Sequence, residues 1–236
     1  MDAAGYATLN RQSGLMREMG VVANNIANSS TTGFRREGVV FSEFIAATDE
    51  GPSLSMAHAS GRHVDLSQAT VSQTGGQFDL AIQGEGFFLV QTPQGDQLTR
   101  AGSFVPSPEG ELMTPDGFRL LDAGGAPVFV PPQARGIAIA QDGTLSADGQ
   151  PIAQIGLWQP SDPLSLRHQS GTLFSAGAVE PAEGARILQG MLEDSNVEPV
   201  SEIARMIEVQ RAYELGQKFL DAEDERVRGV ITTLGR

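Results

Sequence analysis

The sequence contains no cysteine, few aromatic residues and no long apolar run. Without cysteine, the 236-residue chain can form neither a disulfide nor a thiolate metal site. No stretch approaches the roughly 20 apolar residues that a membrane-spanning helix needs, so we expect no membrane span. The N-terminus also lacks a basic segment followed by an apolar one. We therefore expect a chain without a cleavable signal peptide.

Positive charge is scarce as well. Sixteen Lys and Arg residues face 29 Asp and Glu residues, which leaves a formal net charge of −13. The densest basic pair, Arg35-Arg36, cannot follow a phosphate backbone, so we expect no nucleic-acid partner. Apolar residues nevertheless make up 40% of the chain, enough for a folded core.

The motifs that would indicate chemistry are incomplete. Gly84-Glu85-Gly86 begins like a dinucleotide-binding loop, but Leu89 stands where the third glycine belongs. Asp142-Gly143 and Asp148-Gly149 lack the alternating ligands of a calcium loop and predict hairpin turns instead. We expect no catalytic residue, no metal and no cofactor, and hence no enzyme. A secreted binding module or a hydrolase built from scattered residues is the alternative from another class.

Apolar spacing predicts a helix at each end of the chain. Residues 3–28 carry a 3/4-spaced stripe that turn formers end, and a second stripe follows Pro199 for about four heptads. Gly14 and Gly20 either allow close helix approach or are simply tolerated. We expect the stripes to pack partly on each other and partly on neighbouring chains. The predicted interface residues on these stripes are Leu9, Met16, Met19, Val22, Ile26, Met206, Val209, Tyr213, Leu220, Val227 and Val230.

Three asparagines near the end of the first helix belong to the same predicted interface. Asn24 and Asn28 share a helix face at i,i+4, and Asn25 lies beside them. Their amides could hydrogen-bond to neighbouring chains or cap the helix. Capping suits Asn28 but does not require Asn24 or Asn25, for which we favour the interface.

Between the helices the apolar period changes from 3.6 to 2, and Gly-containing turns recur. The sequence therefore predicts an α+β fold in three parts. Residues 1–38 plus 196–236 form a helical, coiled-coil-like domain that is discontinuous in sequence. Residues 80–170 form an inserted all-β domain, and 39–79 plus 171–195 are extended connectors.

Several segments carry specific patterns, in order along the chain. At the start, Ala23–Asn28 is followed by Thr31–Arg35; in the middle, Gly84–Phe88 is followed by Leu98–Phe104. Near the end, Gln189–Val200 leads into Met206–Glu214. This combination resembles the signatures of bacterial flagellar rod and hook proteins.

The resemblance implies a structural subunit of the flagellar basal-body rod, in the periplasm. Its terminal helices would polymerise with other copies and with neighbouring rod proteins, and its β-domain would face outward. Secretion through the flagellar type III export apparatus would explain the missing signal peptide. Met1-Asp2, Arg11-Gln12 and the modest length favour the proximal rod over the distal rod or the hook. Phe41 and Ile45 also resemble an export-gate motif.

Overall fold

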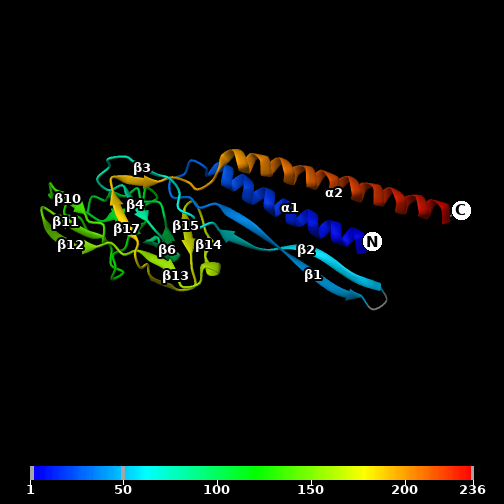
Figure 1. Ribbon diagram of the computed structural model, residues 1–236, viewed down its shortest axis with the longest axis horizontal. Helices are drawn as coiled ribbons and strands as arrows, with labels where there is room; N and C mark the ends of the chain where they lie inside the picture. The colour runs from blue at the N-terminus through cyan, green and yellow to red at the C-terminus, as the bar shows by residue number, and fades with distance from the viewer. Residues whose placement is uncertain (1–2, 49–50, 235–236) are drawn as a thin grey trace. The chain divides into compact units, whose positions relative to one another are not determined.

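The computed structural model describes residues 3–48 and 51–234 (Figure 1). They divide into two units, each discontinuous in sequence. The helical unit comprises Met1–Ala27, Glu37–His63 and Glu198–Arg236. The β unit comprises Asn28–Arg36 and Val64–Val197. The α+β class expected from the sequence is confirmed.

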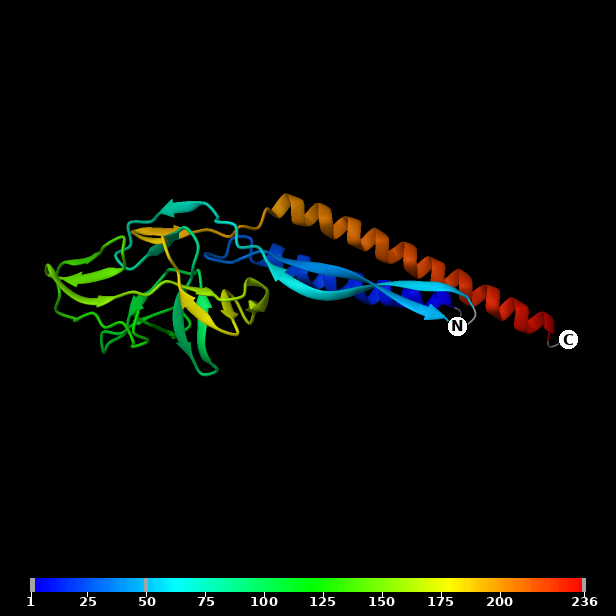
Figure 2. The same ribbon diagram turned by 60° about the horizontal axis from the view of Figure 1, so that its bottom comes forward.

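The helical unit is built on two antiparallel helices, α1 (Ala3–Ala27) and α2 (Pro199–Leu234). Pro199 opens α2 because proline is tolerated in a first turn, where its missing N–H has no partner to lose. Figures 1 and 2 both show the helices side by side, with α2 continuing past the N-terminal end of α1. Among the described residues, the last turns of α2 therefore have no helix of this unit beside them.

A long hairpin completes the helical unit. Its strands, β1 (Glu37–Thr48) and β2 (Gly51–Val64), pair only with each other among the described residues. We predicted an extended connector here. The structure instead forms a two-stranded ribbon whose first strand contacts α1.

The β unit contains several small sheets around one larger sheet. The larger sheet has the strand order β14-β15-β6-β5-β9-β8-β7. Its members are β5 (Phe88–Thr92), β6 (Gly95–Thr99), β7 (Val105–Pro106), β8 (Leu112–Met113), β9 (Arg119–Leu120), β14 (Arg167–His168) and β15 (Leu173–Ser175). The remaining elements are β3 (Val71–Gln73), β4 (Leu80–Gln83), β10 (Ile137–Ile139), β11 (Thr144–Ala147), β12 (Gln150–Gln154), β13 (Trp158–Pro160), the 3-10 helix η1 (Pro163–Ser165), β16 (Val179–Pro181), β17 (Arg186–Gln189) and β18 (Met191–Glu193).

Strand β5 joins two apolar clusters of the β unit. Successive side chains of a strand point to opposite faces. Phe88 and Val90 accordingly pack into one cluster, while Leu89 packs with Phe87 in the other. This arrangement explains why 87–90 reads as an uninterrupted apolar run: both faces of the strand are covered.

The Asp-Gly pairs form hairpin turns, as predicted. Asp142-Gly143 joins β10 to β11, and Gly143 has a φ of 88°. Asp148-Gly149 joins β11 to β12 with φ values of 50° and 81°, the left-handed pair that a type I′ turn needs. Aspartate and glycine tolerate this conformation better than other residues.

Strands in the two segments that we predicted as connectors pair inside the β unit, one with a strand of the predicted β-domain and one with a strand of the other connector. Strand β17 pairs with β4, and β18 pairs with β3, both antiparallel. Residues 64–79 and 171–195 therefore belong with the β unit in the structure. Their partners lie over a hundred residues away in sequence, so no local period could reveal the pairing.

Candidate assembly interface

Polar contacts tie α1 to α2 in the middle of the helical unit. Gln12 Nε2 donates a hydrogen bond to the backbone oxygen of Tyr213 at 2.8 Å. Gly216 makes room for this amide, because a Cβ at Gly216 would lie 2.5 Å from Gln12 Nε2. Gly20, by contrast, faces open space. Gly14 is buried, and Gly216 adds a glycine of the second helix at which the two helices approach closely.

Asn25 is fully buried and forms its hydrogen bonds within the helical unit. Its Nδ2 donates to the Glu37 backbone oxygen at 2.9 Å and to Glu202 Oε2 at 3.0 Å. Its Oδ1 accepts from the Glu37 backbone N–H at 3.0 Å. With 0% of its surface exposed, Asn25 cannot meet a neighbouring chain. Our assignment of Asn25 to the surface between subunits is therefore corrected: it joins α1 to β1 and α2.

The other two asparagines differ from Asn25. Asn24 is exposed, as an interface residue must be. Asn28 lies in the turn that follows α1, where its Oδ1 accepts a hydrogen bond from Thr31 Oγ1 at 3.1 Å. The turn-stabilising interpretation fits Asn28 well.

The predicted stripe residues fall into three groups by burial. Val22 and Val209 are buried in the described structure, so they serve the unit itself rather than a neighbour. Of the two kinds of packing that we expected for the stripes, these two residues take part in the one inside the chain. The half-buried group is Met19, Ile26, Met206, Tyr213 and Leu220. The exposed group is Leu9, Met16, Val227 and Val230.

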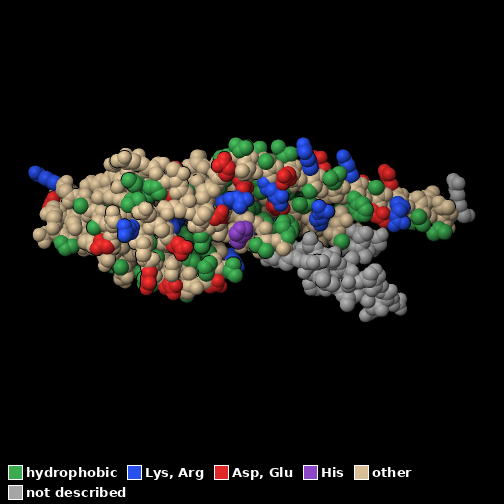
Figure 3. All heavy atoms as spheres, viewed as in Figure 1, with side chains coloured by type: hydrophobic (Ala, Val, Ile, Leu, Met, Phe, Trp, Pro, Cys, Tyr) green, Lys and Arg blue, Asp and Glu red, His purple; other side chains and the backbone are tan. Residues whose placement is uncertain are grey.

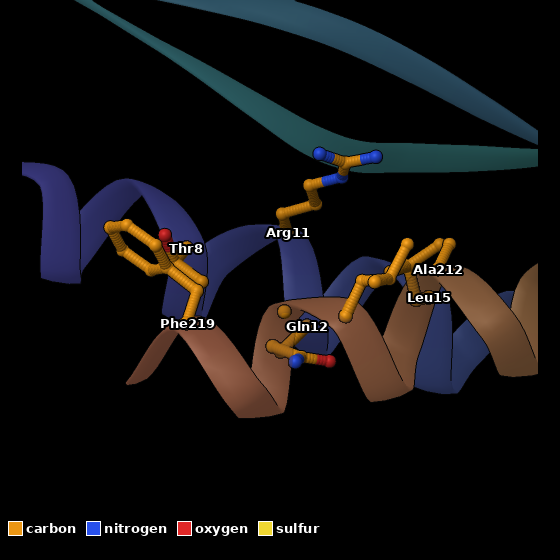
Figure 4. A pocket seen from close by; sticks show the side chains of 8 residues that line it. Thr8, Arg11, Gln12, Leu15, Ala212 and Phe219 are labelled. Carbon is orange, nitrogen blue, oxygen red and sulfur yellow. The ribbon is translucent and has the colours of Figure 1, made fainter. Parts of the chain in front are cut away.

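Two apolar grooves run along the α1/α2 pair. One, of about 360 Å³, is lined by Thr8, Leu15, Leu215 and Phe219, among others. Figure 4 shows Phe219 beside Thr8, and Arg11 directed away from α2. The second groove, of about 420 Å³, is lined by Leu9, Leu220 and Val227 together with charged residues of α2.

Exposed apolar side chains of α2 extend well beyond the residues that we predicted. Figure 3 shows hydrophobic side chains over the beginning of α2 and again near its end, with charged ones between. Leu234 is 82% exposed and Val200 73%. The 3/4 spacing of the sequence already includes Leu234, and Ile203, Ile207, Leu215 and Phe219 broaden the same apolar face. The additional exposed residues are Val200, Ile203, Ile207, Leu215, Phe219, Ile231 and Leu234.

The β unit contains a buried ion cluster that sequence reasoning missed. Glu193 pairs with Arg35 through Oε1 at 2.6 Å and with Arg100 through Oε2 at 2.9 Å. Glu193 Oε1 also accepts from the Ala69 backbone N–H at 2.9 Å. Arg35 and Glu193 have fully buried side chains, and Arg100 is 3% exposed. Burial lowers the pKa of Arg100 to about 10, with Glu193 opposing the shift.

One carboxylate thus bridges two guanidinium groups, and the cluster keeps a net positive charge. Arg100 Nη2 also donates to the Gly84 backbone oxygen at 2.6 Å, which distributes part of its charge. Within the described part of the chain, Arg35 Nε and Nη1 have no hydrogen-bond partner. Each member of the cluster comes from a different signature segment. The sequence feature that could have indicated this cluster is a charged residue inside a motif that otherwise consists of apolar or turn-forming residues.

The remaining site predictions concern export and chemistry. Phe41 is partly exposed, whereas the side chain of Ile45 lies outside the described residues. In the described part of the chain, no three His, Asp or Glu side chains gather in a way that could hold a metal. No helix over those residues has both the length and the apolar character needed to cross a membrane.

Three family models match the chain, in order from its N-terminus. The flagella basal body rod protein model matches residues 6–35. The flagellar hook protein FlgE/F/G D1 domain matches residues 81–147. The flagellar basal body rod FlgEFG protein C-terminal model matches residues 188–232. The chain belongs to this family of flagellar rod and hook proteins.

Individual relatives narrow the position within the family. The flagellar basal-body rod protein FlgF of Caulobacter vibrioides is 39% identical, over 100% of this chain and 99% of its own length. FlgF of Mesorhizobium japonicum is 35% identical, over 94% and 95%. FlgG of Bacillus subtilis is 29% identical, over 96% and 97%. Of these relatives, the two FlgF proteins are more similar to the chain than FlgG is, and the chain is a structural subunit of the flagellar basal-body rod.

Proposed function

We propose that the chain is a subunit of the proximal rod and polymerises through its helical unit. It would contact other copies of itself and neighbouring rod proteins. The observation that carries this proposal is the apolar surface that α2 leaves exposed along most of its length. The end-to-end similarity to FlgF proteins supports the proximal rod over its distal counterpart.

The energetics favour burial of this surface on assembly. Apolar surface removed from water contributes about 25 cal/mol per Å². Monomeric proteins seldom expose contiguous apolar patches of more than a few hundred Å². A head-to-tail contact between different faces of identical chains continues as a helical filament unless it closes into a ring. An elongated, double-grooved helix pair suits such contacts.

We further propose that the subunit reaches the periplasm through the flagellar type III export apparatus, without a cleavable signal peptide. The export-gate motif is supported by Phe41, an aromatic residue at the position that the motif requires, whose side chain is partly exposed. Mutation of Phe41 to Ala should lower the amount of subunit outside the cytoplasm while leaving expression unchanged. Unchanged export would remove this motif from the proposal.

The decisive experiment is deletion of the gene followed by electron cryomicroscopy of basal bodies. Cells without the protein should lack complete rods and be non-motile, yet grow normally. In complemented cells, the level of the subunit along the rod separates the proximal from the distal assignment. Normal filaments on the deletion strain would contradict the rod assignment altogether.

A further inference from the structure

Three positions on the face of α1 toward α2 hold polar side chains where a simple apolar pair would hold leucine. Gln12, Glu18 and Asn25 are 7%, 7% and 0% exposed. All three contact α2, so they lie along the seam between the two helices, six and then seven residues apart. Polar groups buried in such a seam weaken it unless each one finds its partner. Their presence therefore calls for a physical explanation.

Each of the three side chains has a partner at one particular place along α2. Gln12 bonds to the Tyr213 backbone oxygen, and Asn25 bonds to Glu202. Glu18 accepts a hydrogen bond from Arg205 Nε at 2.7 Å. A slip of α2 by one turn, about 5.4 Å, would separate all three pairs together. Reversal of α2 would invert their order and separate them as well.

Shape reinforces the polar pairing at two points. The notch at Gly216 accepts the Gln12 amide, and a residue with a Cβ in its place would meet that amide at 2.5 Å. Glu202 is only 2% exposed, and in this register its carboxylate accepts a hydrogen bond from the Asn25 amide. Asn25 in turn is held by both backbone groups of Glu37. Asn25 is thus held by β1 independently of α2.

We infer that Gln12, Glu18 and Asn25 are specificity-determining residues that fix the antiparallel orientation and the register of α1 against α2. Because of these three residues, α1 pairs with a helix that carries Glu202, Arg205 and Gly216 at matching intervals in preference to other apolar helices. In a rod, such residues would keep α1 paired with α2 of its own chain among many similar helices, and this part of the inference rests on the proposed function. The register itself is a property of the single chain, so its test does not depend on rod assembly.

Paired cysteines can read the register because the chain has none of its own. Thr8→Cys is combined with either Phe219→Cys, its neighbour in the groove, or Ala212→Cys, about 10 Å away along α2. Each pair is oxidised in the purified full chain at low concentration, and intramolecular disulfides are quantified by mass spectrometry. In the otherwise native chain we expect the 8–219 disulfide to exceed the 8–212 disulfide about tenfold, the ratio that one specific hydrogen bond can support.

The same pairs are then placed in a Gln12→Leu/Asn25→Leu background. Loss of the polar contacts should bring the two disulfide yields close to equal while helical circular dichroism is kept. The matched control, Asn10→Leu/Asn24→Leu, replaces two exposed amides of α1 and should retain the native ratio.

A native ratio in the Gln12→Leu/Asn25→Leu chain would overturn the inference. If that chain lost its helical signal, Gln12→Leu alone supplies the test, since it leaves every Asn25 bond in place. The single variant should raise the 8–212 yield, and an unchanged yield would again overturn the inference. Neither result depends on whether the protein assembles into rods.

Discussion

The β unit and the helical unit treat their apolar residues in opposite ways. In the β unit, large side chains such as Phe88, Leu112 and Phe174 are completely buried. In the helical unit, α2 buries Val209 but exposes Ile203, Leu215 and many others. The β unit has therefore completed its core within one chain. The helical unit leaves much apolar surface exposed, which fits the assembly that we propose.

The two units also use buried polar groups differently. In the β unit, Glu193 pairs with both Arg35 and Arg100, so the ion cluster holds distant segments of one core together. In the helical unit, the amides of Gln12 and Asn25 and the carboxylate of Glu18 bond to separate groups along α2. Buried ion pairs are costly to break, whereas polar seam residues mainly exclude wrong registers. The first arrangement favours a unit that is stable alone, and the second a unit that pairs correctly.

Native-state hydrogen exchange should show the largest difference between the units. In the purified monomer, amides of β5 and β6 should exchange only through global unfolding, which costs about 5 kcal/mol or more. Amides of α2 beyond Leu220 should open at almost no cost. Residues 28–36 should be protected with the β unit, because the Gly33 N–H donates to the Glu193 backbone oxygen at 2.7 Å. Equal protection of both units in a proven monomer would contradict the comparison.

Removal of Glu193 should give the next largest effect. Glu193→Ala leaves two buried guanidinium groups without their carboxylate, which costs about 3–5 kcal/mol when one partner of a buried pair is lost. Trp158, the single tryptophan, lies in the β unit, so its fluorescence in a urea titration reports this loss.

Asp194→Ala provides the neighbouring control. Asp194 is exposed, and its carboxylate accepts one hydrogen bond from Ser72 Oγ. Its unfolding midpoint should stay close to that of the native chain. Identical midpoints for the Glu193 and Asp194 variants would show that the ion cluster does not stabilise the β unit.

A smaller change tests the helical surface. Leu220 is half-buried and lines the second groove with Leu9 and Val227. Leu220→Ala should cost about 2 kcal/mol, the low end for leucine truncation, and this loss recurs in every subunit of a rod. We expect the variant to be exported but to build few rods, measured by swarming motility and by electron microscopy. Glu225→Ala, at an exposed position, should swim normally. Equal motility of the two would place the assembly face elsewhere.

The smallest effect is expected at the hairpin tips of the β unit. Asp142 Oδ1 accepts the Thr144 N–H, and Asp148 Oδ1 accepts the Gly136 N–H, both at 2.9 Å. An asparagine oxygen can accept the same bonds, and asparagine tolerates the left-handed conformation of residue 148. The triple variant Asp116→Asn/Asp142→Asn/Asp148→Asn should therefore fold and support motility as the native chain does.

The pH dependence of this variant has a defined sign. Hydrogen bonds from Thr144 lower the pKa of Asp142 in the folded chain. A lowered folded pKa stabilises the fold above the unfolded pKa, and that contribution disappears as the pH falls through the folded pKa. The Asn variant should lose this acid-side dependence, read from urea midpoints against pH. A folded, exported triple variant without function would instead indicate carboxylate chemistry.

Local patterns in the sequence were sufficient for much of this picture. The 3/4 spacing, the turn formers after residue 27 and Pro199 predicted both terminal helices close to their observed bounds. The Asp-Gly pairs predicted hairpin turns because few residues adopt the conformations that such turns need. The signature segments identified the family. All of these depend on residues a few positions apart, where backbone geometry alone relates one residue to the next.

The tertiary structure decided what long-range contacts do with the same residues. Asn25 lies 177 positions from Glu202, and Arg35 lies 158 from Glu193. Nothing local distinguishes an asparagine that faces a neighbouring chain from one that is buried inside its own. Nor does any local period show that β4 pairs with β17, or that Gly216 receives Gln12. A hydrogen bond or ion pair needs two groups within about 3 Å. For segments so far apart in sequence, only the folded chain sets that distance.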